Sequence, residues 1–136
     1  MSVIYIATLG QRPEAITVAF DRLHEQYHYQ AMGILHTEPN ISGIAQAFTD
    51  LRTVCRRDYP TIPVHFHEIA FEDGTPFIDI ENQQSAEAYY RGVLQVLYGY
   101  KRDGWRVHLM IAGGRKAMSI YAMLAASVIF ETPHDC

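Results

Sequence analysis

The sequence contains little cysteine and no excess of basic residues. Cys55 and Cys136 are the only cysteines among 136 residues, which excludes a disulfide-stapled scaffold and favours a reducing compartment such as the cytoplasm. Lysine and arginine together number 11 against 15 aspartates and glutamates, and the formal net charge is −4. This balance argues against a broad basic surface for nucleic acid, so we expect no DNA partner. A small anion site remains compatible with it, because net charge averages over local patches.

A long hydrophobic run is also missing. The longest uncharged apolar stretch, 117–130, is shorter than the ~20 residues that a helix needs to cross a bilayer. The first residues carry neither the basic segment nor the cleavage motif of a secretory signal peptide. We therefore expect a cytoplasmic protein with no membrane partner.

The sequence does have enough apolar material for one core, since 49% of its residues are hydrophobic and 19% are charged. Short apolar runs predict strands at 3–8, 31–37, 62–69 and 106–112. Periodic patterns predict helices at 13–28, 44–58, 86–103 and 115–130. Strands that alternate with helices predict an α/β fold: a Rossmann-like, three-layer domain with a mostly parallel central sheet flanked by helices.

Some segments carry more specific expectations. Pro63 cannot donate to a strand ladder, which places the strand at 62–69 near a sheet edge. Residues 39–43 and 71–84 are expected to be loops, the second of a length that is often functional. The helix at 115–130 is apolar nearly all round, which predicts burial on more than one side, and a seam between two copies would explain the excess.

Two loops combine glycine, cations and the start of a helix. The first reads TLGQRP over residues 8–13 and the second reads AGGRKAMS over residues 112–119. Each follows a predicted parallel strand, and ligands bind α/β sheets at the carboxyl ends of strands, near the switch in strand order. Backbone N–H groups and the helix dipole attract anions there, and Arg12, Arg115 and Lys116 add positive charge. The combination predicts a phosphate site.

The common nucleotide motifs are absent. Pro13 and Ala15 stand where the dinucleotide fingerprint needs glycine, and the second loop lacks the spacer and the Lys-Ser/Thr pair of a P-loop. An NAD enzyme or an NTPase is therefore disfavoured, and we expect no cofactor. His65 and His67 share a strand face, but no third metal ligand is apparent, so we expect no metal.

The two loops resemble a known family. ATLGQRPEAIT and IAGGRKAMS resemble motifs of CRISPR-associated Rossmann-fold (CARF) domains, in particular the branch whose second motif usually reads Gly-Gly-Arg-Lys-Thr-Met. Ala117 replaces that threonine, which removes a hydroxyl near the ligand loop. The resemblance spans the chain in outline, so we expect residues 1–136 to form a single CARF-like domain. Truncation of a longer chain is an alternative, because the sequence stops at Cys136, where a further strand would normally begin.

The resemblance implies a homodimer that binds a cyclic oligoadenylate, the second messenger of type III CRISPR antiviral defence, across its two-fold axis. A two-fold cleft suits four or six adenylates better than three, and we favour cyclic tetra-adenylate. Ring nucleases of this family cleave the messenger and switch the response off, and this enzymatic activity is the favoured interpretation. The alternative is a non-catalytic sensor domain that controls a fused or partner effector nuclease.

The implied reaction needs no metal. The ribose 2′-hydroxyl attacks its own 3′-phosphate and the 5′-oxygen leaves, so that linear products end in a 2′,3′-cyclic phosphate. The catalytic candidates are Lys116 and Arg115 at the scissile phosphate, with Thr8 and Gln11 orienting a neighbouring nucleotide. The expected ligand-binding residues are Thr8, Leu9, Gly10, Gln11, Arg12, His36, Gly113, Gly114, Arg115, Lys116, Met118 and Ser119. His36 is the best-placed general base, although a hydrogen-bonded histidine at a sheet end and cleavage without a dedicated base are both alternatives.

Overall fold

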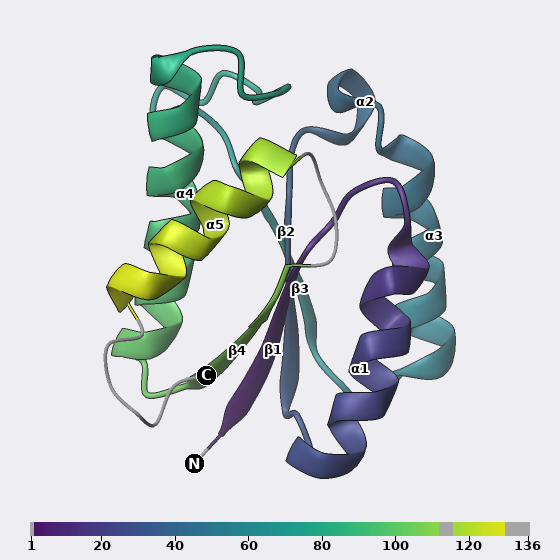
Figure 1. Ribbon diagram of the computed structural model, residues 1–136. Coiled ribbons are helices and arrows are strands. Elements are labelled where there is room, and N and C mark those ends of the chain that lie inside the picture. Colours follow the sequence, from purple (N-terminus) through teal and green to yellow (C-terminus); the bar gives the residue numbers. More distant parts are fainter. Residues whose placement is uncertain (1, 112–115, 130–136) are drawn as a thin grey trace.

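Figure 1 shows the computed structural model of the chain, which describes residues 2–111 and 116–129. Strands alternate with helices along the described chain. The elements are β1 Val3–Thr8, α1 Pro13–Tyr27, β2 Ala31–His36, α2 Pro39–Ser42, α3 Ala45–Asp58, β3 Val64–Glu68, α4 Gln83–Arg102, β4 Arg106–Met110 and α5 Lys116–Ile129.

The described strands form one parallel sheet in the order β3-β2-β1-β4. The central strand β1 pairs Ile4 with Ala31 of β2 on one side and with Val107 of β4 on the other. Every residue of β1 and β2 is buried, because helices cover both faces of a parallel sheet. The predicted α/β, Rossmann-like architecture is confirmed.

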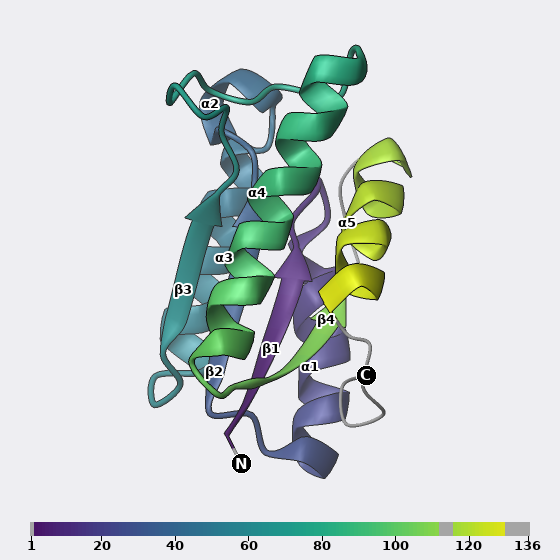
Figure 2. The same ribbon diagram turned by 90° about the vertical axis from the view of Figure 1, so that its left-hand side faces the viewer.

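Two helical layers enclose the sheet. α1 and α3 cover one face and α4 and α5 cover the other (Figures 1 and 2). Side chains alternate between the faces along a strand. Tyr5 therefore joins the core under α1 and α3, whereas its neighbour Ile6 joins the core under α4 and α5.

The prediction of a plain loop after the second strand is wrong, because Pro39–Ser42 forms the short helix α2. Pro39 occupies the first turn, where a missing N–H costs nothing, and the Glu38 carboxylate accepts a hydrogen bond from the Ile41 N–H at 2.6 Å. Gly43 ends the helix with a φ of 83°, in the left-handed region that favours glycine.

Helix α4 begins at Gln83, three residues before the predicted start. The Asn82 side chain accepts a hydrogen bond from the Ser85 N–H at 2.9 Å, and the Ser85 hydroxyl accepts one from the Asn82 N–H at 3.0 Å. This reciprocal capping box stabilises a first turn that has no apolar periodicity of its own. The helical pattern of the sequence therefore indicated a later start.

The outer strands differ in length from their predictions. β3 covers Val64–Glu68 and is an edge strand of the described sheet, so the expectation from Pro63 is confirmed. β4 covers Arg106–Met110 rather than 106–112, and residue 112 lies outside the described residues.

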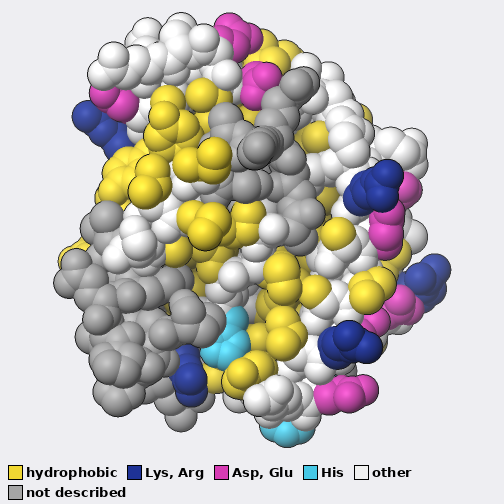
Figure 3. Space-filling model, in the orientation of Figure 1, with side chains coloured by type: hydrophobic (Ala, Val, Ile, Leu, Met, Phe, Trp, Pro, Cys, Tyr) yellow, Lys and Arg dark blue, Asp and Glu magenta, His cyan; other side chains and the backbone are white. Residues whose placement is uncertain are grey.

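Within a single chain, the described side chains of α5 are buried on one side of the helix, and the expected burial on a further side by a second copy stays a prediction. Met118 and Ala122 face the core, with 7% and 0% of their surface exposed. Ile120, Met123 and Leu124 are exposed, and hydrophobic side chains gather over the position of α5 in Figure 3. No helix in the described part of the chain is long and apolar enough to cross a membrane.

Candidate functional site

The candidate site lies where the strand order reverses. From β1 the chain steps to β2 and then to β3, and it later returns to β4 on the other side of β1. After β1 the chain turns to α1 on one face, whereas the helix that follows β4, α5, lies on the other face (Figure 1). In α/β sheets, such a divergence marks the carboxyl ends of the two strands as the place where ligands bind. Both loops selected from the sequence follow these two strands.

The loop after β1 begins with buried side chains. Thr8 and Leu9 are 3% and 5% exposed, and Gly10 is buried as well. The Leu9 N–H continues the ladder with β2 through a hydrogen bond of 2.9 Å to a backbone carbonyl. The exposed side chains of this loop are Gln11 and Arg12. Among the residues of this loop that were predicted to bind the ligand, Gln11 and Arg12 are therefore the ones whose side chains are accessible from solvent.

Gln11 and Arg12 are held at the start of α1 in different ways. Gln11 donates a hydrogen bond from Nε2 to the carbonyl oxygen of Gly43 at 3.1 Å, which ties this loop to the end of α2. Arg12 is the N-cap residue of α1, and its side chain makes no capping hydrogen bond. Pro13 follows in the first turn. A cation and a helix N-terminus thus lie together, and both favour an anion.

His36 ends β2 at the same edge of the sheet, but its ring packs on the side of α3. It is 6% exposed, and its ring centroid lies 4.8 Å from that of Phe48. Nδ1 is 2.8 Å from the carbonyl oxygen of Thr37, and since a carbonyl can only accept, Nδ1 carries the proton and Nε2 is the basic nitrogen. Burial lowers the pKa of His36. These are the features of a hydrogen-bonded histidine at a sheet end.

Half of the second loop, residues 112–115, lies outside the described residues. Gly113, Gly114 and Arg115 fall in the undescribed segment, whereas Lys116 begins α5 and Ser119 follows within its first turns. For Lys116 and Ser119 the structure describes the course of the backbone. Met118 is 7% exposed and belongs to the core under α4 and α5.

Sequence reasoning missed a polar network beside the first loop. Thr37 is buried, and its hydroxyl donates to the Ser42 hydroxyl at 2.7 Å, which in turn donates to the Glu38 carbonyl at 2.6 Å. The network holds α2 against the end of β2. The sequence feature that could have predicted α2 is Glu38 followed by Pro39, because a proline after a capping residue favours the start of a helix.

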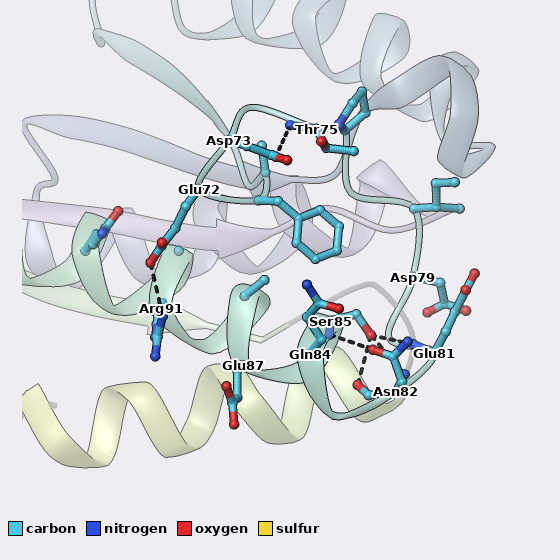
Figure 4. Close-up of a pocket in the computed structure, with 17 residues that line it drawn as sticks. Glu72, Asp73, Thr75, Asp79, Glu81, Asn82, Gln84, Ser85, Glu87 and Arg91 are labelled. Carbon is cyan, nitrogen blue, oxygen red and sulfur yellow. Dashed lines mark hydrogen bonds and ion pairs between the residues drawn. The ribbon is translucent and has the colours of Figure 1, made fainter.

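A separate hollow of about 870 Å³ lies between the loop at 70–82 and α4 (Figure 4). Arg91 forms an ion pair with Glu72 at 3.0 Å, and Asp73 accepts a hydrogen bond from the Thr75 N–H at 2.9 Å. The charged residues of its lining are Glu72, Asp73, Asp79, Glu81, Glu87 and Arg91. Five carboxylates against one guanidinium make this hollow unsuitable for a phosphate ligand.

Among the residues that the structure describes, no group of three or more His, Cys, Asp or Glu side chains is placed to hold a metal ion. His65 and His67 lie on the same face of β3, with ring centroids 6.4 Å apart. Nε2 of His67 is hydrogen-bonded to the Tyr100 hydroxyl at 2.7 Å, and burial lowers the pKa of His67.

The strand order and the two helical layers define a Rossmann-like α/β domain, with a candidate anion-binding edge at its strand-order reversal. The family model of CRISPR-associated protein NE0113 matches residues 12–136, and the chain belongs to that family. The match begins at Arg12 and includes the whole second loop. None of the curated protein sequences matches the chain.

Proposed function

We propose that this CRISPR-associated protein binds a cyclic oligoadenylate, with cyclic tetra-adenylate favoured, at the carboxyl ends of β1 and β4. Two copies of the chain hold one ring and cleave it to linear products that end in a 2′,3′-cyclic phosphate. This reaction would switch off type III CRISPR signalling. The observation that carries the proposal is that the two loops with phosphate-binding character follow the two strands flanking the strand-order reversal.

The distribution of charge supports an anionic ligand at this edge. The acidic hollow carries five carboxylates and one guanidinium, so it alone accounts for the net charge of −4 of the chain. The remaining acidic and basic residues are therefore equal in number. Arg12, Arg115 and Lys116 lie in the two loops, and a dimer brings six such charges to a ring of phosphates.

The proposed mechanism relies on geometry and charge. Lys116 and Arg115 neutralise the charge that grows on the scissile phosphate, and the amides of Gly113 and Gly114 add donors. Gln11 holds the neighbouring nucleotide so that the 2′-hydroxyl stands in line with the leaving 5′-oxygen. No general base is assigned, because the His36 ring is 6% exposed and packs on the side of α3.

The proposal is tested by a product assay with cyclic tetra-adenylate, protein in excess and EDTA present. We expect linear di- or tetra-adenylate with a 2′,3′-cyclic phosphate end. Intact ring that co-elutes with the protein would instead establish the sensor function. No cleavage and no binding, for the six-membered ring as well, would overturn the proposal.

The two lysines of the chain provide a matched pair for the same assay. Lys116→Ala removes the proposed phosphate contact at the start of α5, whereas Lys101→Ala removes a lysine from the last turn of α4, at the opposite end of the sheet. We expect Lys116→Ala to slow cleavage at least 100-fold, since one preorganised donor is worth about 2.7–4 kcal/mol in the transition state. Lys101→Ala should cleave like the parent protein. Equal rates for the two variants, or a melting temperature that falls together with activity in Lys116→Ala, would contradict the catalytic role.

A further inference from the structure

Helix α2 is a single turn at the carboxyl edge of the sheet, and the residue that ends it holds Gln11 (Figure 1). The Gly43 carbonyl oxygen accepts the hydrogen bond of 3.1 Å from Nε2 of Gln11. A Cβ at Gly43 would lie 4.0 Å from the same Nε2, so the Gln11 amide lies directly against this glycine. The orientation of the Gln11 side chain therefore depends on where α2 places Gly43.

A helix of one turn has no stability of its own in water. Fixing the backbone dihedral angles of the first turn costs more free energy than its hydrogen bonds contribute. None of the residues of α2, Pro39–Ser42, is buried, so packing against the core adds little. The position of α2 is therefore set by the groups that bind its two ends.

Glu38 binds the N-terminal end of α2. Its Oε2 accepts a hydrogen bond from the Ile41 N–H at 2.6 Å, and its Oε1 accepts one from Nδ2 of Asn40 at 3.3 Å. The Glu38 carbonyl oxygen accepts two more, from the N–H of Ser42 at 3.0 Å and from the Ser42 hydroxyl at 2.6 Å. This one residue thus accepts hydrogen bonds from three of the four residues of α2.

The charge of Glu38 has the wrong sign for contact with the proposed ligand. Glu38 lies two residues after the end of β2, at the edge where we place an oligoadenylate, and a carboxylate repels phosphate. Both of its carboxylate oxygens are instead bonded to donors of α2. This arrangement favours an action on the helix over an action on the ligand.

We infer that Glu38 is a positioning residue for Gln11. Its carboxylate sets α2, and α2 presents the Gly43 carbonyl oxygen that orients the Gln11 amide at the candidate site. Glu38 acts through Gly43 and does not touch the nucleotide. The inference rests on the proposed function, which assigns Gln11 to the ligand, and it adds the residue that holds Gln11 ready.

The first test needs no ligand. NMR relaxation of the side-chain amide nitrogen measures how tightly the Gln11 amide is held. We expect a restrained amide in the parent protein, a mobile one in Glu38→Ala, and a restrained one in Glu38→Gln, whose side-chain oxygen still accepts from the backbone of α2. Gln46 is the internal control, because its amide is bonded to Asp50 on α3 and should be the same in all three proteins.

The second test measures affinity for the 2′-fluoro analogue of cyclic tetra-adenylate, which lacks the attacking hydroxyl and stays intact. Glu38→Ala should lower the affinity about 3- to 10-fold, because a mobile Gln11 must be ordered when the ligand binds. Glu38→Gln should bind at least as tightly as the parent protein, because it keeps the cap and removes a negative charge. In a Gln11→Ala background, Glu38→Ala should change the affinity by less than about 2-fold.

A Gln11 amide that is equally restrained in the parent protein and in Glu38→Ala overturns the inference. Affinity that rises in both Glu38 variants, or a loss that is the same with and without Gln11, overturns it as well. Should Glu38→Ala fail to fold, Gly43→Ala serves as the second variant, because alanine is strained at a φ of 83°, and it should also release Gln11. A parent protein that binds no ring contradicts the proposed function alone, since the NMR comparison still decides whether Glu38 positions Gln11.

Discussion

Gln11 donates a hydrogen bond from Nε2 to the carbonyl oxygen of Gly43, and this 3.1 Å contact joins segments 32 residues apart in the chain. It links the loop after β1 to the end of α2 at the carboxyl edge of the sheet. A glutamine amide has two N–H donors, so one remains for a ligand while the other holds the loop. The bond therefore fixes the orientation of a side chain that we assign to nucleotide binding.

Replacing Gln11 with alanine should weaken ligand binding more than it weakens the fold. The lost bond is exposed and neutral, so the free energy of unfolding should fall by only about 0.5–1.5 kcal/mol. A bond to a phosphate is worth about 1.5–3 kcal/mol, which corresponds to a loss of affinity for cyclic tetra-adenylate of about 10- to 100-fold. Calorimetric titration measures the affinity. The control is Gln46→Ala, because Gln46 also makes one exposed bond, to Asp50 on α3, and its loss should leave affinity unchanged.

Two glycines of α4 should respond to alanine with opposite signs. A Cβ at Gly92 would lie 2.7 Å from Cγ2 of Ile69, so Gly92→Ala should destabilise the protein by about 1–3 kcal/mol. A Cβ at Gly99 would meet nothing within 4 Å, and Gly99→Ala should stabilise it by up to about 1 kcal/mol through helix propensity. Urea unfolding of both variants measures the difference. A stabilising Gly92→Ala would mean that α4 does not approach Ile69 this closely.

Phe77 should anchor the loop between β3 and α4. Its side chain is fully buried, and its ring centroid lies 5.5 Å from those of Phe71 and Tyr89. Phe77→Ala should therefore cost about 3–5 kcal/mol of unfolding free energy. The neighbouring Ile78 is 47% exposed, and Ile78→Ala should change stability by no more than about 0.5 kcal/mol. Similar costs for the two variants would show that this loop is not packed through Phe77.

Stability should fall as the pH drops below 6.5. Burial lowers the pKa of His36, His67 and His108 in the folded chain. The unfolded chain then binds more protons between the folded pKa and the ordinary value near 6.5, so the free energy of unfolding decreases as pH falls through this window. Each histidine contributes at most about 1.4 kcal/mol per pH unit.

Thermal melting between pH 7 and pH 5 measures this dependence. In His36→Asn, which keeps a donor for the Thr37 carbonyl, the melting temperature should fall less steeply with pH. A parental melting temperature that is constant over this range would contradict the prediction.

The main elements of the fold were predictable because their signals are local. The run VIYIAT of β1 is apolar throughout, as burial on both faces requires, and Pro63 correctly indicated an edge strand. The short helix α2 and the first turn of α4 were missed. Both depend on caps from Glu38 and Asn82 rather than on apolar periodicity.

The candidate site was predictable in part. Glycine, cations and helix starts after two strands are visible in the sequence, so both loops could be selected from it. That the side chains of Thr8 and Leu9 face the interior was not visible, because it depends on which face each residue takes at the end of β1. The same holds for His36, whose packing on the side of α3 is a consequence of strand register.

The local sequence was enough to give the order of the four strands and the four longer helices, the absence of charge from residue 117 to residue 129, and the two loops with phosphate-binding character. Each of these follows from side-chain chemistry and its spacing over a few residues. The pairing of β4 with β1 rather than with β3, and the position of α4 and α5 on one face of the sheet, became apparent from the folded chain. These choices depend on contacts between residues up to about a hundred positions apart, such as Ile4 with Val107, which no local pattern specifies.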